Sequence, residues 1–199
     1  MLRALLLILM VSLISACARE PLLRDSQQLA AWKKHQSMLL ALKDWKIQGR
    51  VGLYTPDEAW PGDIHWTQSE KNYDMRIIAP LGAGTLHIYT VDGGVMLEHS
   101  SEPMAQFSPD PEVFIEQKFG WQLPVNSLRY WMTGVPSPQG ELSGAMDLDE
   151  QGRLKSLHQS GWNIQFSKYT NVSGYALPAK VLLEYKDLSV KIVIRKWQI

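Results

Sequence analysis

Two groups of residues in this sequence come close, by type and spacing, to known sites of chemistry: an acidic loop and a set of histidines. Asp147, Asp149, Gln151 and Gly152 follow the first half of a calcium-binding loop, whose twelfth position is a Glu that supplies two ligand oxygens. The twelfth position here is His158, and strand-like patterns rather than helical ones flank the loop. We therefore interpret the acidic residues as a hairpin turn and predict no metal site.

The histidines show no spacing typical of metal ligands. They are His35, His65, His87, His99 and His158. The sequence also contains no nucleophile-elbow serine motif, no zinc-protease motif and no phosphate-binding glycine loop. No nucleophile and base form a recognisable pair, so we predict no catalytic residue and no enzyme. The formal net charge is +0 at pH 7, which is not the electrostatic footprint of a nucleic-acid-binding protein.

Cys17 is the only cysteine, so a disulfide within the chain is impossible. It follows Arg3 and an apolar run over residues 4–14, which is shorter than the roughly 20 residues that a membrane-spanning helix needs. Ile14-Ser15-Ala16-Cys17 resembles the bacterial lipobox, in which the Cys thiol takes a diacylglycerol and the chain is cut just before it. We expect a signal peptide over residues 1–16 and a mature protein that begins at a lipidated Cys17.

The residues after Cys17 predict a short tether followed by one domain. We expect residues 17–26 to be the lipidated tether and residues 27–199 to fold as a single domain. Ala18, where Asp would favour retention in the inner membrane, resembles the sorting signal for export to the outer membrane. A helix is predicted over residues 27–43 with Ser26 as its cap, because apolar side chains recur near helical spacing. These are Leu29, Trp32, Leu39 and Leu40.

The rest of the chain has mostly the period-two pattern of half-buried strands. Strands are predicted over 45–53, 62–68, 73–79, 84–91, 95–99, 141–148, 153–160, 162–169, 180–186 and 188–197. Two helices interrupt them: one from Asp110-Pro111 to Phe119, ended by Gly120, and a shorter one capped by Asn126 that ends near Gly134. Short strands joined by hairpin turns predict a mainly β fold, an antiparallel sheet or barrel, with the helices covering one face or one end.

The large apolar side chains leave two interpretations open. The chain holds 8 tryptophans and 8 methionines, and Trp is rarely buried completely. A well-packed core accounts for them. A barrel with free space for an apolar ligand accounts for them too, since flexible Met side chains suit irregular ligands.

A resemblance to a known family bears on that choice. The segment Pro124-Val125-Asn126-Ser127-Leu128-Arg129-Tyr130-Trp131-Met132-Thr133-Gly134-Val135-Pro136 resembles the P-x-N-S-L-x-x-W-x-x-G-x-P segment of the LolB family of outer-membrane lipoproteins. Ala79-Pro80-Leu81-Gly82 is similar to the Pro-Leu-Gly loop that this family places between two strands. Leu177-Pro178-Ala179-Lys180 and Trp197 fit its closing strands, so the resemblance covers essentially the whole chain.

The resemblance implies an incomplete antiparallel β-barrel, or half-barrel, with a helical lid over a hydrophobic cavity for acyl chains. It also implies a monomeric receptor, anchored to the inner leaflet of the outer membrane and facing the periplasm. Such a receptor accepts lipoprotein cargo from the periplasmic carrier LolA and inserts it into outer-membrane lipid. No nucleotide, metal or other cofactor takes part.

The resemblance also assigns roles to residues. Leu81 matches the family's exposed loop leucine, and Pro80 and Gly82 shape a turn that points it outward, in a role in membrane insertion or release. Candidates to line the cavity are Trp45, Ile47, Trp66, Met75, Ile77, Trp121 and Trp131. For each of these, ordinary core packing is the competing interpretation.

Three other functions remain open from the residues. A lipoprotein of the same shape that binds another lipid would have no need of the Pro-Leu-Gly loop. A structural or assembly lipoprotein, which binds proteins through its sheet edges, would have no need of a cavity. A lipid-acting enzyme is the least supported, because it requires a nucleophile and base that the sequence does not present.

Overall fold

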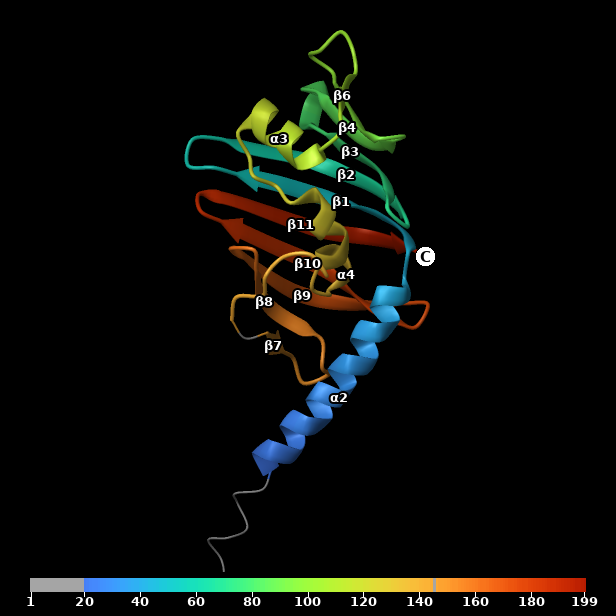
Figure 1. Ribbon diagram of the computed structural model, residues 1–199, viewed down its shortest axis with the longest axis vertical. Helices are drawn as coiled ribbons and strands as arrows, with labels where there is room; N and C mark the ends of the chain where they lie inside the picture. Colours follow the sequence, from blue (N-terminus) through green and yellow to red (C-terminus); the bar gives the residue numbers. More distant parts are fainter. Residues whose placement is uncertain (1–19, 145) are drawn as a thin grey trace, which may run out of the picture.

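The fold is built on a single antiparallel sheet of 11 strands, seen in a computed structural model that describes residues 20–144 and 146–199. The strand order is β6-β5-β4-β3-β2-β1-β11-β10-β9-β8-β7. The first and last strands of the chain, β1 and β11, therefore pair at the centre, and the sheet stays open at β6 and β7. Two short helices, α3 and α4, cross one face of the curved sheet (Figure 1). This confirms the predicted incomplete barrel.

The strands and helices divide the chain as follows. The strands are β1 (Asp44–Tyr54), β2 (Ala59–Ser69), β3 (Asn72–Ile78), β4 (Thr85–Val91), β5 (Gly94–His99), β6 (Gln106–Ser108), β7 (Asp147–Leu148), β8 (Leu154–Gln159), β9 (Trp162–Val172), β10 (Tyr175–Tyr185) and β11 (Leu188–Gln198). The helices are α2 (Glu20–Ala41), α3 (Pro111–Phe119), α4 (Val125–Thr133) and the 3₁₀ turn η2 (Pro80–Gly82). Among the described residues, none of the helices is long and apolar enough to cross a membrane.

The alternating pattern of β1 shows why the strands form. Trp45, Ile47 and Val51 are buried, whereas Lys46 and Arg50 between them are exposed. Successive strand side chains point to opposite faces, so this alternation gives the strand one apolar face and one charged face. The register continues the apolar face across the sheet, with Ile47 opposite Trp66 of β2 and Trp197 of β11.

The helix α3 has the ends that the sequence predicts. The Asp110 carboxylate accepts hydrogen bonds from the backbone N–H groups of Glu112 and Val113, and Gly120 ends the helix with φ 73°. The start of α4 differs from the prediction, because Pro124 rather than Asn126 precedes its first turn and makes no side-chain cap. Instead, the Glu112 carboxylate of α3 accepts from the backbone N–H of Asn126 at 3.1 Å.

Other predicted boundaries were wrong as well: β2 begins at Ala59 and not at residue 62, β10 begins at Tyr175 and not at residue 180, and β6 was not predicted. The helix α2 begins at Glu20 and ends at Ala41, so Ser26 lies within it and does not cap it. The predicted strand 141–148 is reduced to a bridge between Leu142 and Gln159 and the two-residue β7. Gly140 and Gly144 take positive φ, which breaks the extended backbone there.

Candidate ligand cavity

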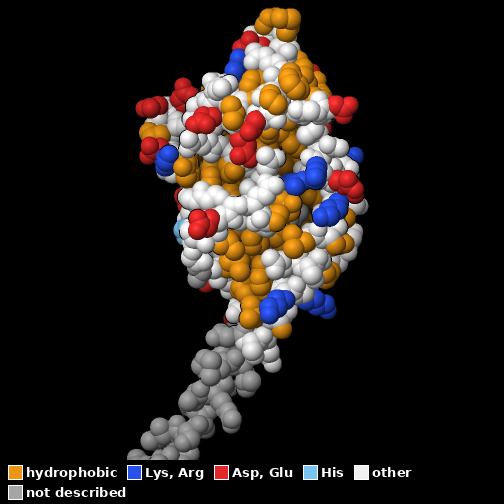
Figure 2. Space-filling view, viewed as in Figure 1, with side chains coloured by type: hydrophobic (Ala, Val, Ile, Leu, Met, Phe, Trp, Pro, Cys, Tyr) orange, Lys and Arg blue, Asp and Glu red, His pale blue; other side chains and the backbone are white. Residues whose placement is uncertain are grey.

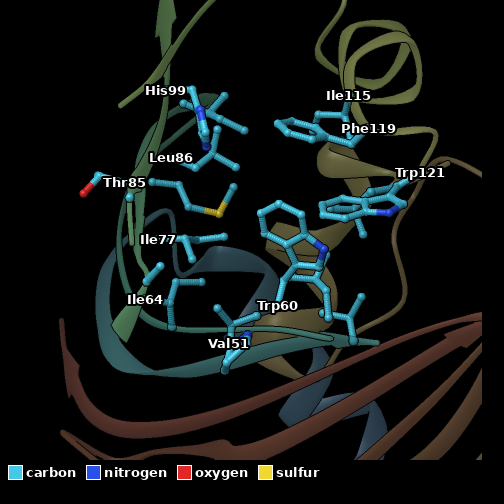
Figure 3. Close-up of a pocket in the computed structure, with 18 of the residues that line it drawn as sticks. Val51, Trp60, Ile64, Ile77, Thr85, Leu86, His99, Ile115, Phe119 and Trp121 are labelled. Carbon is cyan, nitrogen blue, oxygen red and sulfur yellow. The ribbon is translucent and has the colours of Figure 1, made fainter. Parts of the chain in front are cut away.

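A cavity with about 100 Å³ of unfilled space lies between the sheet and the residues of the lid segment, defined here as α3 and the chain up to Leu123. A single water needs roughly 10–15 Å³ on the same scale, so the unfilled volume is that of several water molecules. The walls are almost entirely apolar, and Thr85 and His99 are the polar side chains among the described lining residues. Figure 3 shows Ile77 and Leu86 of the strands facing Phe119 and Trp121 of the lid segment.

The sheet side of the cavity is made by rows of apolar side chains in register. Trp66 lies opposite Met75, which in turn lies opposite Ile88, and a second row joins Ile64, Ile77 and Leu86. Because paired residues on neighbouring strands present their side chains to the same face, the alternation in each strand becomes one continuous apolar wall. The further apolar strand residues that line the cavity are Val51, Leu53, Trp60, Pro61, Val190 and Ile192.

Three aromatic rings close the cavity between β2 and the lid segment. Trp60 meets Trp121 edge to face with ring centroids 6.0 Å apart, and Trp121 stacks on Phe119 at 5.1 Å. The Trp60 indole N–H donates to the Glu58 carboxylate at 2.9 Å. Trp60 is nevertheless 45% exposed, so this side of the cavity borders solvent.

Four of the seven residues expected to line the cavity do so: Trp66, Met75, Ile77 and Trp121. The other three lie in the packed core outside it. Trp45 packs against the rings of Trp66 and Trp197, at centroid distances of 5.1 and 5.4 Å, with Ile47 buried in the same region. Trp131 is held on the far side of α4, where its indole N–H donates to the Gln159 side-chain oxygen at 2.9 Å.

Sequence reasoning named only four of the residues that line the cavity, and the missed ones include two of its aromatic residues, Trp60 and Phe119. Trp60 has the same period-two phase as Ile64 and Trp66, a signal lost because the strand was predicted to begin at residue 62. Phe119 is the last residue of α3, and no local pattern indicates what a helix end will face.

The Pro80-Leu81-Gly82 loop stands at one end of the cavity. Its flanking residues Ala79 and Ala83 line the cavity, while the Leu81 side chain is 106% exposed and so contacts no other residue closely. Leu81 also has φ 56°, a left-handed conformation that is unfavourable for a Leu. Leu81 therefore combines an apolar side chain held fully in water with an unfavourable backbone conformation.

The acidic loop that resembled a calcium site is a hairpin turn. Asp149 accepts from the backbone N–H groups of Gln151 and Arg153, and it also accepts from the Arg153 guanidinium at 2.7 Å. No group of three or more potential metal ligands occurs in the described part of the chain. Cys17 lies outside the described residues.

Comparison with known proteins gives the family. The sequence model of the family "Outer membrane lipoprotein LolB" matches residues 43–197, which include the whole sheet apart from its last residue. The chain belongs to the LolB family.

Two LolB relatives, both named "Outer-membrane lipoprotein LolB", are similar over nearly their full length. The one from Pseudomonas putida strain F1 is 37% identical over 195 residues, covering 95% of this chain and 92% of the relative. The one from Pseudomonas aeruginosa strain LESB58 is 35% identical over 191 residues, covering 94% and 92%.

One solved structure shares the fold at low sequence identity. A DUF1329 family protein from Desulfovibrio piger superposes with a TM-score of 0.50 at 7% identity, covering 87% of this LolB chain and 92% of the other. A LolA superfamily protein from Nitrosomonas europaea gives a TM-score of 0.49 at 8% identity, covering 85% and 92%.

Proposed function

We propose that this protein is a monomeric receptor that accepts lipoproteins from the periplasmic carrier LolA, holds their acyl chains in the cavity and inserts them into the outer membrane. One observation carries the proposal: in a LolB-family chain, an apolar cavity adjoins a loop that presents a fully exposed Leu81. The function consists of binding and release. It therefore needs no enzymatic step, nucleotide, metal or other cofactor.

The chemistry of acyl chains explains why a cavity is needed. Each methylene exposed to water costs about 0.8 kcal/mol, so a lipoprotein cannot cross the aqueous periplasm with its chains uncovered. Handover of the cargo without an energy source requires that the affinity for its acyl chains rise from the carrier to the receptor and from the receptor to the bilayer. An almost wholly apolar lining gives the affinity without fixing a particular chain geometry.

Entry of acyl chains requires the cavity to widen. Two or three acyl chains occupy far more space than the present 100 Å³. We propose that the lid segment moves outward, because it meets the sheet through side-chain contacts such as Trp60 with Trp121 and is fixed by the half-buried ion pair of Lys118 with Glu102. Rings that slide apart can be replaced by acyl chains at little cost, since both are apolar.

Leu81 is proposed to enter the bilayer when cargo is released. In a Leu81→Glu variant, insertion into vesicles should fall on the order of tenfold or more, because a carboxylate in hydrocarbon costs a few kcal/mol. Receipt of cargo from the carrier should be unchanged. Met104→Glu is the matched control, since Met104 is also an exposed apolar residue of a loop, at 77% exposure. Normal insertion by the Leu81→Glu protein would exclude the proposed role.

Cys17 is proposed as the lipid anchor, after removal of residues 1–16 as a signal peptide and with residues 17–26 as the tether to the domain. Two or three acyl chains make anchoring effectively permanent. The anchor would hold the receptor on the inner leaflet of the outer membrane, facing the periplasm, at a high local concentration beside its target. A Cys17→Ala protein should be recovered in the soluble fraction and still bind cargo. Recovery in the membrane pellet would contradict the anchor.

The direct test of the whole proposal is transfer in solution. A radiolabelled lipoprotein bound to the carrier is mixed with the Cys17→Ala protein, and the two proteins are separated. The label should move to the receptor without ATP and then to added vesicles. If the label stays on the carrier, a different lipid ligand or an assembly role becomes the better interpretation.

A further inference from the structure

The face of the sheet that points away from the cavity carries a dense set of cations. Val51, Val190 and Ile192 line the cavity, so the residues that alternate with them lie on the opposite face. The cations that alternation places there on the adjacent strands β1, β11 and β10 are Lys46, Arg50, Lys180, Lys191 and Arg195. A register shift in the pairing of β1 with β11 adds Lys196, which lies opposite the exposed Gln48, and these six cations are called here the basic face.

Few carboxylates balance this face. Asp63 is 3.7 Å from both Arg50 and Arg195, Glu184 is near the end of β10, and Asp44 begins β1 on the same face as Lys46. Within the described chain, no ion pair involves Lys180 or Lys191. The formal charge of the chain is nonetheless +0, so its acidic groups are concentrated elsewhere.

Part of the acidic charge lies on the helix-covered side. Figure 2 views that side, and acidic side chains gather over its upper part, where α3 lies in Figure 1. The helix and its cap contribute Asp110, Glu112 and Glu116 against Lys118. The molecule is therefore polarised, with a basic outer sheet face and an acidic lid. Such a separation orients a protein beside a charged surface.

The basic face is continuous with the Leu81 loop. A shallow groove of about 400 Å³ runs from Pro80 of the loop across β2 and β1 to Arg50, Lys191 and Val193. Val193 is 37% exposed, and in the register of the sheet it lies directly between Arg50 of β1 and Lys180 of β10. An exposed apolar loop tip beside a cluster of cations is the arrangement of an interfacial membrane-binding surface.

We propose that the basic face binds the anionic headgroups of a phospholipid bilayer while Leu81 enters its hydrocarbon. This deepens the proposed function and rests on it for the role of Leu81. The long Lys and Arg side chains reach phosphate oxygens while their stems lie along the sheet. Docking through this face turns the cavity end marked by Ala79 and Ala83 toward the bilayer that receives the cargo.

The test measures vesicle binding without cargo or carrier. The Cys17→Ala chain, which lacks the anchor, is floated with vesicles of phosphatidylcholine alone or with phosphatidylglycerol, at low and high salt. We expect binding only where phosphatidylglycerol is present, with a loss at high salt. Each cation near the surface is worth roughly a fivefold change in partition. Lys180→Glu with Lys191→Glu should therefore lower binding on the order of tenfold or more.

Matched variants distinguish the effect of the basic face from the effect of net charge and from the effect of Leu81. Lys33→Glu with Lys71→Glu makes the same change in net charge on exposed residues outside the basic face and should bind like the parent. If the Lys180→Glu and Lys191→Glu double variant fails to fold, Lys180→Gln with Lys191→Gln takes its place. The expected loss of vesicle binding is then smaller, because the charges are removed and not reversed. Leu81→Glu should weaken binding at every salt concentration.

Two results would overturn the proposal. One is equal vesicle binding by the basic-face pair and its control. The other is normal vesicle binding by the basic-face pair with loss of cargo receipt in solution, which would assign the face to an acidic surface of the carrier. Failure of cargo transfer in the parent protein, with vesicle binding intact, would count against the proposed function alone.

Discussion

The two ends of the sheet are built from the same alternating strands, yet one encloses space and the other is filled. In the filled half, which comprises β8, β9, β10 and α4, Leu157, Ile164 and Leu177 are 0% exposed. In the hollow half, which comprises β1 to β5 and the lid segment, Ile77, Leu86 and Trp121 are only partly buried around the cavity. Because the strand pattern is the same, the difference lies in the helix that covers each half.

The two helices are held by different forces. The helix α4 packs on β10, and Trp131 on it is 0% exposed and bonded to the buried Gln159. The lid segment buries Phe114 and Ile115, but its open side meets the sheet through rings that border solvent and through a half-buried ion pair, Lys118 with Glu102. A buried polar network fixes one geometry, whereas apolar contacts tolerate sliding. Under the proposed function, α4 is therefore the fixed support and α3 the movable cover.

The largest expected effect is a difference between the two halves in the free energy of unfolding that a buried side chain contributes. Ile164→Ala in the filled half should lower the free energy of unfolding by about 3–4 kcal/mol, because a full side chain is replaced by a new void. Ile77→Ala in the hollow half should cost about 1 kcal/mol, since Ile77 is half-buried and already borders free space. Urea denaturation measures both. Equal losses would mean that the halves are packed alike.

A smaller effect compares two buried glutamines that each accept from a Trp indole. Gln159 accepts from Trp131 and from the backbone N–H of Ser137, and donates to the Ser137 carbonyl at 2.7 Å. Gln68 accepts from Trp66 at 3.1 Å and donates to one carbonyl. Gln159→Leu leaves more hydrogen-bonding groups unpaired than Gln68→Leu does. It should lower the free energy of unfolding by about 2–3 kcal/mol, and Gln68→Leu should lower it by about 1 kcal/mol. A larger loss for Gln68→Leu in thermal or urea unfolding would reverse the comparison.

The smallest effect concerns the lid. The hydrogen bond and charge of Lys118, 2.7 Å from Glu102, hold the pKa of that carboxyl below its ordinary value. A lowered carboxyl pKa means that the pair is intact above the ordinary carboxyl pKa and is lost as the pH falls through the lowered value. Uptake of a fluorescent fatty acid should therefore be modestly faster in acid.

A Lys118→Met variant isolates that pair. It should show faster uptake at neutral pH and lose the acid dependence that the pair causes, while its unfolding transition stays close to that of the parent. Stopped-flow uptake across pH measures this. The same acid acceleration in the variant as in the parent would show that the pair does not restrain the lid.

Local patterns predicted most of the sheet, because period-two alternation directly encodes one buried face, as in Trp45 to Leu53. They predicted α3 from Asp110 and Gly120, whose conformations are set within a few residues. They did not separate cavity from core. Trp66 and Trp131 are both almost fully buried tryptophans, but only Trp66 borders the cavity. What lies opposite an apolar side chain depends on residues far along the chain, such as Gln159 for Trp131.

The central claim is that acyl chains occupy the hollow half and not the filled half. Cargo lipoprotein carrying a photoreactive group at the end of an acyl chain is transferred to the protein, irradiated and mapped by mass spectrometry. We predict cross-links to cavity residues such as Trp60, Ile77 and Trp121. Cross-links concentrated on Leu157, Trp162 or Ile164 of the filled half, or none within the domain after cargo has bound, would contradict the account.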